Sequence, residues 1–132
     1  MNLADTVHAD PRDAARGADI IVACVPVGAI PELVRACLPE LAPDAAICDV
    51  GSAKAQLVAT IESFFPDAAV PFVGVHPIAG SERDGLDAAH ADLYAGQTVV
   101  LTPTARTAPA ALAAVRAFWS ALGAKITETD PD

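Results

Sequence analysis

The chain has few basic residues, few aromatic side chains and no long apolar run. Eight Lys and Arg stand against 17 Asp and Glu, and the resulting net charge of −9 predicts repulsion from a phosphate backbone. We therefore expect no nucleic-acid partner. No segment approaches the roughly 20 apolar residues that span a bilayer, and residues 1–10 lack the basic and apolar regions of a signal peptide. We expect no membrane partner and a cytoplasmic location.

Cysteine is also scarce. Cys24, Cys37 and Cys48 cannot all pair with one another, and no two of them have the spacing of metal ligands. Cys24 and Cys48 lie in apolar strand-like runs and Cys37 in a helical segment, where free thiols behave as small hydrophobic residues. This pattern predicts free thiols, a reducing compartment and no metal site.

The glycines are nowhere spaced as G-x-G-x-x-G, the turn that holds a pyrophosphate in many nucleotide-binding sheets. The 132 residues, 53% of them hydrophobic, are enough for one globular domain with one core. The composition is therefore that of a folded domain and excludes a disordered chain.

Short apolar runs alternate with helical segments, which predicts an α/β fold with a parallel sheet covered by helices. The expected strands, of which the first two are fully buried, cover residues 20–25, 45–50, 71–76, 98–101 and 125–127. The expected helices begin at Pro11 and end near Gly17, cover residues 31–38, follow Ser52 and cover residues 109–122.

Loops follow three successive strands at residues 26–28, 51–54 and 76–77. Right-handed crossover connections bring the carboxyl ends of these strands to one edge of the sheet. Ligands of α/β proteins bind outside that edge, so the three loops predict a single site.

His76 and Ser52 are the candidate catalytic residues in these loops. An imidazole with an ordinary pKa near 6.5 suits His76 to accept a proton or a hydrogen bond from a substrate hydroxyl, or His76 simply ends its strand. Ser52 is placed to cap the helix that follows it, and its hydroxyl is also placed to orient His76 or a ligand.

Four further residues near these loops have structural or ligand-binding interpretations. Asp49 is expected to fix its loop by accepting hydrogen bonds from backbone amides. Lys54 is placed to meet an anionic ligand, although we favour a solvated lysine in the first turn of a helix. Ser81 and Glu82 either line a polar pocket or cap the next segment.

Three segments together resemble the prephenate/arogenate dehydrogenase family. They are Asp19-Ile20-Ile21-Val22-Ala23-Cys24-Val25-Pro26-Val27, Asp49-Val50-Gly51-Ser52-Ala53-Lys54 and Gly74-Val75-His76-Pro77-Ile78-Ala79-Gly80-Ser81-Glu82. The last segment discriminates this family from other β-hydroxyacid dehydrogenases and from pyrroline-carboxylate reductases, which share only the apolar strand ending in Val-Pro. The similarity extends over nearly the whole chain.

The resemblance implies an NAD- or NADP-dependent oxidoreductase of tyrosine biosynthesis that acts on prephenate or arogenate. On the family pattern, His76 accepts the proton of the substrate hydroxyl, and Ser52 holds His76 and the nicotinamide in register. Val25, Pro26 and Val27 match the loop beside the dinucleotide, whereas Ser81 and Glu82 match positions at the mouth of the active site.

The resemblance also implies that parts of the family's architecture are absent. The chain is expected to be a partial Rossmann-like domain that lacks the first glycine-rich βαβ unit and the helical dimerisation domain. We therefore expect an apolar sheet edge, an isolated chain of little or no activity, and a homodimer only for a full-length form. The competing hypotheses are a non-catalytic remnant or partner-binding module, and a different reductase of the same sheet class.

Overall fold

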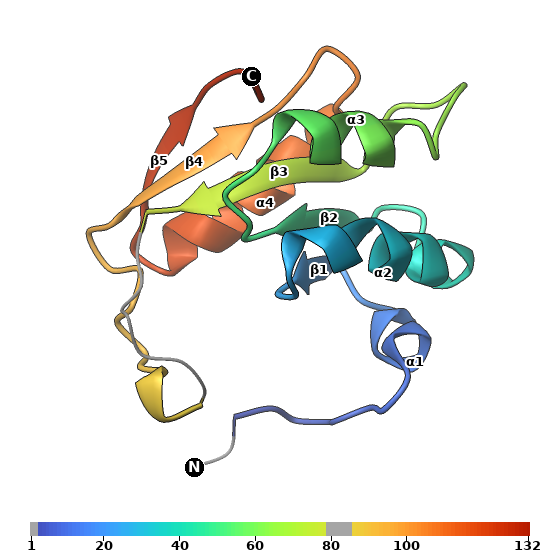
Figure 1. The fold of residues 1–132 in the computed structure, drawn as a ribbon. Coiled ribbons are helices and arrows are strands. Elements are labelled where there is room, and N and C mark those ends of the chain that lie inside the picture. The colour runs from blue at the N-terminus through green and yellow to red at the C-terminus, as the bar shows by residue number, and fades with distance from the viewer. Residues whose placement is uncertain (1–2, 79–85) are drawn as a thin grey trace.

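The computed structural model describes residues 3–78 and 86–132, which form a five-stranded sheet with helices on both faces (Figure 1). The strands are β1 (Ile20–Ala23), β2 (Ala46–Asp49), β3 (Phe72–Pro77), β4 (Thr98–Thr102) and β5 (Lys125–Glu128). The α-helices are α1 (Pro11–Ala15), α2 (Ile30–Cys37), α3 (Ala55–Glu62) and α4 (Pro109–Ala121). The predicted α/β fold class is confirmed.

Both ends of α1 have the residues expected at helix ends, whereas the start of α3 does not. The Asp10 carboxylate caps α1 by accepting a hydrogen bond from the Arg12 amide at 2.9 Å, and Gly17 follows this helix with a φ of +74°. The expected cap at Ser52 is wrong, because α3 begins at Ala55 and no side chain caps it.

The sheet has the order β1-β2-β3-β4-β5 and is mixed in direction. β1, β2 and β3 are parallel as predicted, but β4 runs antiparallel to β3, and β5 runs parallel to β4. Parallel neighbours need a long crossover, usually a helix. Within the described part of the connection from β3 to β4, the only helical segment is the short turn at Leu86–Ala88, so β4 folds back on β3.

β1 is an edge strand, and its burial differs from the prediction. Ile20, Ile21 and Val22 are half-buried, because β1 pairs with β2 alone, whereas β2 is buried along its whole length. Cys24 lies beyond the end of β1 and is exposed, so its expected place inside a buried strand is wrong.

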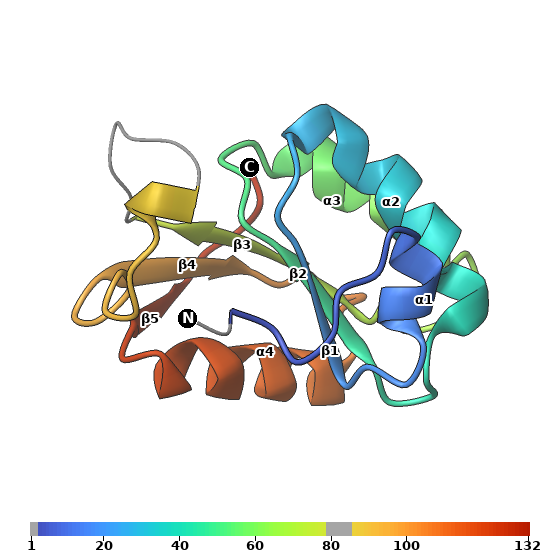
Figure 2. The ribbon, with the colours of Figure 1, turned by 90° about the horizontal axis from the view of Figure 1, so that it is seen from below.

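Two apolar layers hold the helices to the sheet, as seen along the sheet in Figure 2. α2 and α3 cover one face through a cluster that includes Ile30, Val34, Ile47, Val58, Ile61 and Phe72. α4 covers the other face through Cys48, Val73, Val75, Val99, Leu101, Val115 and Trp119. The Trp119 ring packs edge-on against Tyr94 and Phe118, with centroids 5.0 and 5.4 Å away.

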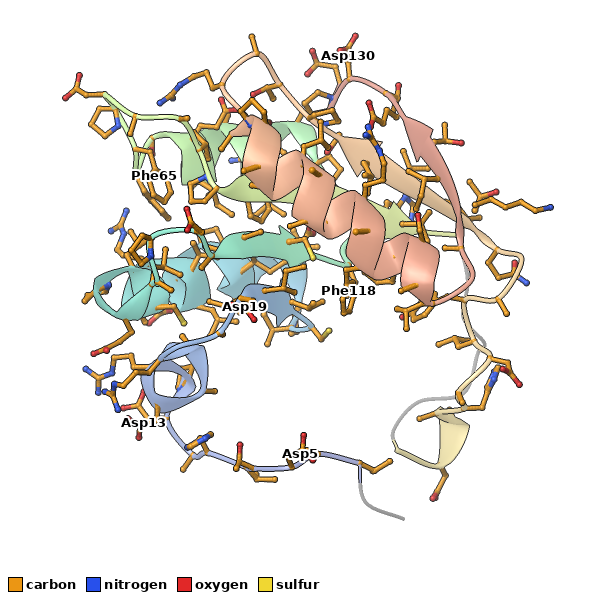
Figure 3. The ribbon with its side chains drawn as sticks, turned by 180° about the vertical axis from the view of Figure 1, so that it is seen from behind. Asp5, Asp13, Asp19, Phe65, Phe118 and Asp130 are labelled. Carbon is orange, nitrogen blue, oxygen red and sulfur yellow. The ribbon has the colours of Figure 1, made fainter. Side chains whose placement is uncertain are left out.

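Asp5, Asp13, Asp19 and Asp130 lie outside these layers. In Figure 3, α4 crosses in front of the sheet, the labelled side chains of Asp5, Asp13 and Asp130 lie at the periphery, and Asp19 lies just before β1. All four residues are exposed, which is how a chain with a net charge of −9 avoids burying unpaired charge.

Arg106 ties the loop after β4 to the end of α3. Its guanidinium donates to the carbonyl oxygens of Glu62 at 3.1 Å and Ala68 at 3.3 Å, and also to that of Phe65. The last carbonyls of a helix have no partner within the helix, and Arg106 satisfies that of Glu62 together with two carbonyls of the loop that follows α3.

We expect Arg106→Ala to lower the free energy of unfolding by about 1–3 kcal/mol, because charged hydrogen bonds to backbone carbonyls are lost. Urea denaturation followed by circular dichroism measures this change. Arg116→Ala is the control, since Arg116 pairs with Glu128 at the surface and an exposed pair contributes at most about 1 kcal/mol. Equal losses in the two variants would contradict the role of Arg106.

Candidate active site

The carboxyl ends of β1, β2 and β3 lie at one edge of the sheet, as their parallel pairing requires (Figure 1). The loop that begins at Cys24 follows β1, the turn from Val50 to Lys54 follows β2, and His76 is the penultimate residue of β3. The structure therefore brings the described parts of the three predicted loops to the same edge.

His76 is half-buried on the sheet face that α2 and α3 cover further along the strand. Side chains alternate along β3, and Val73 and Val75 belong to the cluster under α4, so Gly74 and His76 face the opposite side. Val100 of β4 is the register partner of His76. The imidazole is thus held on a paired strand while part of it remains accessible.

Asp49 is the fully buried last residue of β2, and its carboxylate joins the elements of the site. One oxygen, Oδ1, accepts a hydrogen bond from the Val75 amide at 2.9 Å. The other, Oδ2, accepts from the Gly51 amide at 2.9 Å and from the Lys54 ammonium group. The prediction that Asp49 fixes its loop through backbone amides is confirmed.

Lys54 is buried and pairs with Asp49, so the expected solvated lysine is wrong. Only 6% of its side chain is exposed. Burial lowers the pKa of Lys54, and the Asp49 carboxylate opposes that shift by stabilising the charged form. Sequence analysis missed the pair, although an Asp at the end of a buried strand already signalled that a donor must lie nearby.

Two glycines make room for this ion pair. A Cβ atom on Gly51 would lie 3.1 Å from Asp49 Oδ2 and 2.6 Å from Val27 Cγ2. A Cβ atom on Gly74 would lie 2.4 Å from Thr102 Oγ1 and 3.2 Å from Lys54 Cδ. Real Cβ atoms do not approach other atoms at 2.4–2.6 Å, so both positions exclude a side chain unless their neighbours move.

Ser52 is exposed in the turn between the two groups that bond Asp49 Oδ2. Both Ser52 and His76 are in the described part of the chain, and no hydrogen bond joins them there. The structure places Ser52 in the turn after β2 and His76 near the end of the adjacent strand β3.

Val25, Pro26 and Val27 lie in the loop after β1, with Pro26 exposed and both valines half-buried. Val27 also lines a pocket of about 280 Å³ between the first turns of α2 and α3. The other lining residues are Gly28, Pro31, Ala53, Gln56, Leu57 and Thr60. The loops after β1 and β2 are therefore adjacent and share one concave surface.

The two remaining predicted site residues, Ser81 and Glu82, lie outside the described residues. Within residues 3–78 and 86–132, no group of three or more His, Cys, Asp or Glu side chains is arranged to hold a metal ion. None of the helices in that part of the chain has the length and hydropathy needed to cross a bilayer.

Residues 1–128 match the family model described as "Prephenate dehydrogenase, nucleotide-binding domain". The chain is 39% identical over 126 residues to the cyclohexadienyl dehydrogenase of Zymomonas mobilis, an alignment that covers 96% of this chain and 42% of that protein. The chain thus spans less than half the length of this relative.

Two solved structures of similar proteins each have 32% sequence identity to the chain and a TM-score of 0.81. One is the arogenate dehydrogenase of Synechocystis, of which the chain covers 42% while 91% of the chain is aligned. The other is the prephenate dehydrogenase of Aquifex aeolicus in complex with hydroxyphenyl propionate and NAD+, with 93% of this chain and 41% of that one covered.

We expect Gly74→Ala to destabilise the fold by about 1–3 kcal/mol, because the new methyl group overlaps Thr102 and crowds Val58 and Lys54. Thermal and urea unfolding measure this loss. Gly28→Ala is the matched control, since a Cβ atom there meets nothing within 4 Å. If Gly74→Ala unfolds like Gly28→Ala, the close packing around the ion pair is wrong.

We expect a thiol reagent at pH 8 to modify Cys24 alone. Cys24 is exposed, whereas Cys37 and Cys48 are buried and out of reach of the reagent, and burial also raises the pKa of Cys37 and raises that of Cys48 to about 12. Burial and Asp49 also raise the pKa of Cys24, so its reaction is slower than that of free cysteine. Absorbance of the released chromophore gives the count of modified thiols, and Cys24→Ser reduces it to zero. Modification of more than one thiol in the folded chain would contradict this burial.

Proposed function

The chain belongs to the family of prephenate dehydrogenase nucleotide-binding domains, and we propose that it is the catalytic-loop part of a prephenate or arogenate dehydrogenase. One observation carries the proposal: His76 stands at the carboxyl end of a strand, beside a turn that presents Ser52 and is fixed by Asp49. The family match over residues 1–128 supplies the chemical context for that arrangement.

The dinucleotide is proposed to meet the loops after β1 and β2. The exposed Pro26 and Ser52 and the adjacent half-buried valines offer a mixed apolar and polar surface suited to the nicotinamide end. A G-x-G-x-x-G turn for the pyrophosphate does not occur in residues 1–132. When bound, the nicotinamide supplies the acceptor for a hydride. The choice between NAD and NADP is to be read by assaying both.

The proposed reaction needs one proton acceptor and good orientation. His76 accepts the proton of the ring hydroxyl while a hydride leaves the ring carbon that bears this hydroxyl. The hydroxyl oxygen thereby becomes a carbonyl oxygen. The electrons of the bond to the ring carboxylate enter the ring as CO₂ departs, and the carbonyl oxygen becomes a phenolic oxygen, to which His76 returns the proton. Ser52 is proposed to orient the imidazole and the nicotinamide from the neighbouring turn.

The Aquifex aeolicus protein supports this assignment, because its structure contains NAD+ together with hydroxyphenyl propionate, a molecule with an aromatised ring and a phenolic hydroxyl. We propose that Ser81 and Glu82 contact the substrate. We further propose that the enzyme is cytoplasmic, in keeping with the free thiols of Cys24, Cys37 and Cys48. We also propose that its full-length form is a homodimer.

A non-catalytic partner-binding module is the second candidate, and the open edge of β1 favours it. The half-buried Ile20, Ile21 and Val22 line an apolar groove of about 290 Å³ beside that strand, and unpaired strand edges bind other strands readily. Reduction of NAD+ or NADP+ in the presence of prephenate or arogenate would reject this candidate.

In the full-length form, we expect His76→Asn to lower kcat about 10²- to 10⁴-fold, because the proton acceptor is lost. The Kd of the dinucleotide should stay within about twofold, since His76 does not hold the cofactor. Stopped-flow absorbance of the reduced nicotinamide and calorimetric titration of the dinucleotide measure the two quantities. His90→Asn serves as the control, because His90 lies in the loop before β4 and has no role in the proposed reaction. Wild-type turnover in His76→Asn would reject the role of His76.

A further inference from the structure

The β2–β3 ladder ends where the site begins. Its register pairs are Ile47 with Phe72 and Cys48 with Val73, after which β3 continues alongside β4 alone. At that point the Asp49 side chain replaces the neighbouring strand, because its Oδ1 accepts the hydrogen bond of the Val75 amide. Val75 immediately precedes His76, so a side chain rather than the ladder of β2 holds the strand at this position.

The second oxygen of the same carboxylate closes the turn after β2. Oδ2 accepts from the Gly51 amide at one end of the turn and from the Lys54 ammonium group at the other, and Ser52 lies between them. His76 and Ser52 belong to different strand ends. They are nevertheless held by the two oxygens of one side chain.

Three donors therefore converge on a carboxylate that is fully buried. The two carboxylate oxygens have enough lone pairs to accept from all three donors, and the ammonium group of Lys54 compensates the buried negative charge. Lys54 is almost fully buried and forms an ion pair with Asp49, so its ammonium group neutralises this carboxylate and is not accessible to a ligand.

The strand end is also held from its other side. The Thr102 hydroxyl of β4 donates to the Gly74 carbonyl oxygen at 3.1 Å, and Lys54 Cδ lies 3.2 Å from the position of a Gly74 Cβ atom. The two residues that precede His76 are thus fixed by side chains from β2 and β4, in addition to the β3–β4 ladder.

We propose that Asp49 and Lys54 are a positioning pair, which sets the end of β3 and the turn after β2 in one arrangement and so aligns His76 with Ser52. This inference rests on the proposed function. Neither residue contacts the reacting atoms in this assignment: Asp49 acts through the Val75 and Gly51 amides, and Lys54 acts through Asp49.

The first test measures amide hydrogen exchange in the 132-residue chain by NMR. In Lys54→Met, we expect the Val75 amide to exchange at least about tenfold faster, because its acceptor loses its counter-charge. The Val73 amide, which lies in the β2–β3 ladder, should keep its rate. Lys125→Met is the matched control, since Lys125 is exposed on β5 and has no place in the pair.

Asp49→Leu/Lys54→Met removes both charges and the acceptor of the Val75 amide, and gives a second variant in case an unpaired buried charge prevents folding. It should show the same selective loss at Val75. Unchanged exchange at Val75 in this variant, or equal acceleration at Val73 and Val75, would overturn the positioning pair.

The second test compares kinetics in the full-length form. We expect the double variant to lower kcat about 10- to 100-fold, as a shift of order 1 Å in a reacting group does. The KM of the dinucleotide should change by less than about twofold. Arg106→Ala is the stability control, because it loosens the end of α3 without touching the site. Equal losses of kcat in the two variants would assign a purely structural role and overturn the proposal.

The two tests separate failure of this inference from failure of the proposed function. A wild-type full-length protein without activity on prephenate or arogenate would reject the proposed function and, with it, any role of the pair in that reaction. Selective exchange at Val75 would then still show that the pair fixes the strand end. An active wild type with an unaffected double variant would reject the positioning role alone.

Discussion

The organisation of the site depends on a carboxylate that is removed from water. Asp49 is fully buried at the end of β2, and an ionised carboxylate in such a place is stable only when donors surround it. The structure supplies the Lys54 cation and the Gly51 amide from the following turn, and the Val75 amide from β3. The requirement to satisfy Asp49 therefore joins residues 49–54 to Val75, which lies 26 residues further along the chain than Asp49.

That junction explains the neighbouring glycines as well. Gly51 lies against Val27 and the Asp49 carboxylate, whereas Gly74 lies beneath the stem of Lys54 and beside Thr102. A side chain at either position would displace an atom that the ion pair needs. Both glycines have ordinary backbone angles, so it is the space around them, and not a left-handed conformation, that explains their presence.

The reversal of β4 shapes the surroundings of His76. Since β4 runs antiparallel to β3, Val100 lies opposite His76 and Thr102 opposite Gly74. Thr102 can then donate to the Gly74 carbonyl, and β4 continues the sheet past the point where β2 has ended. The histidine consequently lies on a well-paired strand next to a gap in the ladder, where a ligand can approach the sheet edge.

Much of the fold and the family could be predicted from the sequence, because both depend on local patterns. Apolar runs, helix caps and proline positions predicted the strands and most helices, and the segments around His76, Ser52 and Pro26 indicated the family.

The direction of β4 could not be predicted in this way, since it depends on how the chain returns after β3. The half-buried state of β1 and the exposure of Cys24 likewise depend on neighbours across the sheet. The pairing of Lys54 with Asp49 was decided only by tertiary structure: a lysine in a first helical turn is ordinarily solvated, and only the convergence of β2, β3 and α3 creates the buried carboxylate that it must neutralise.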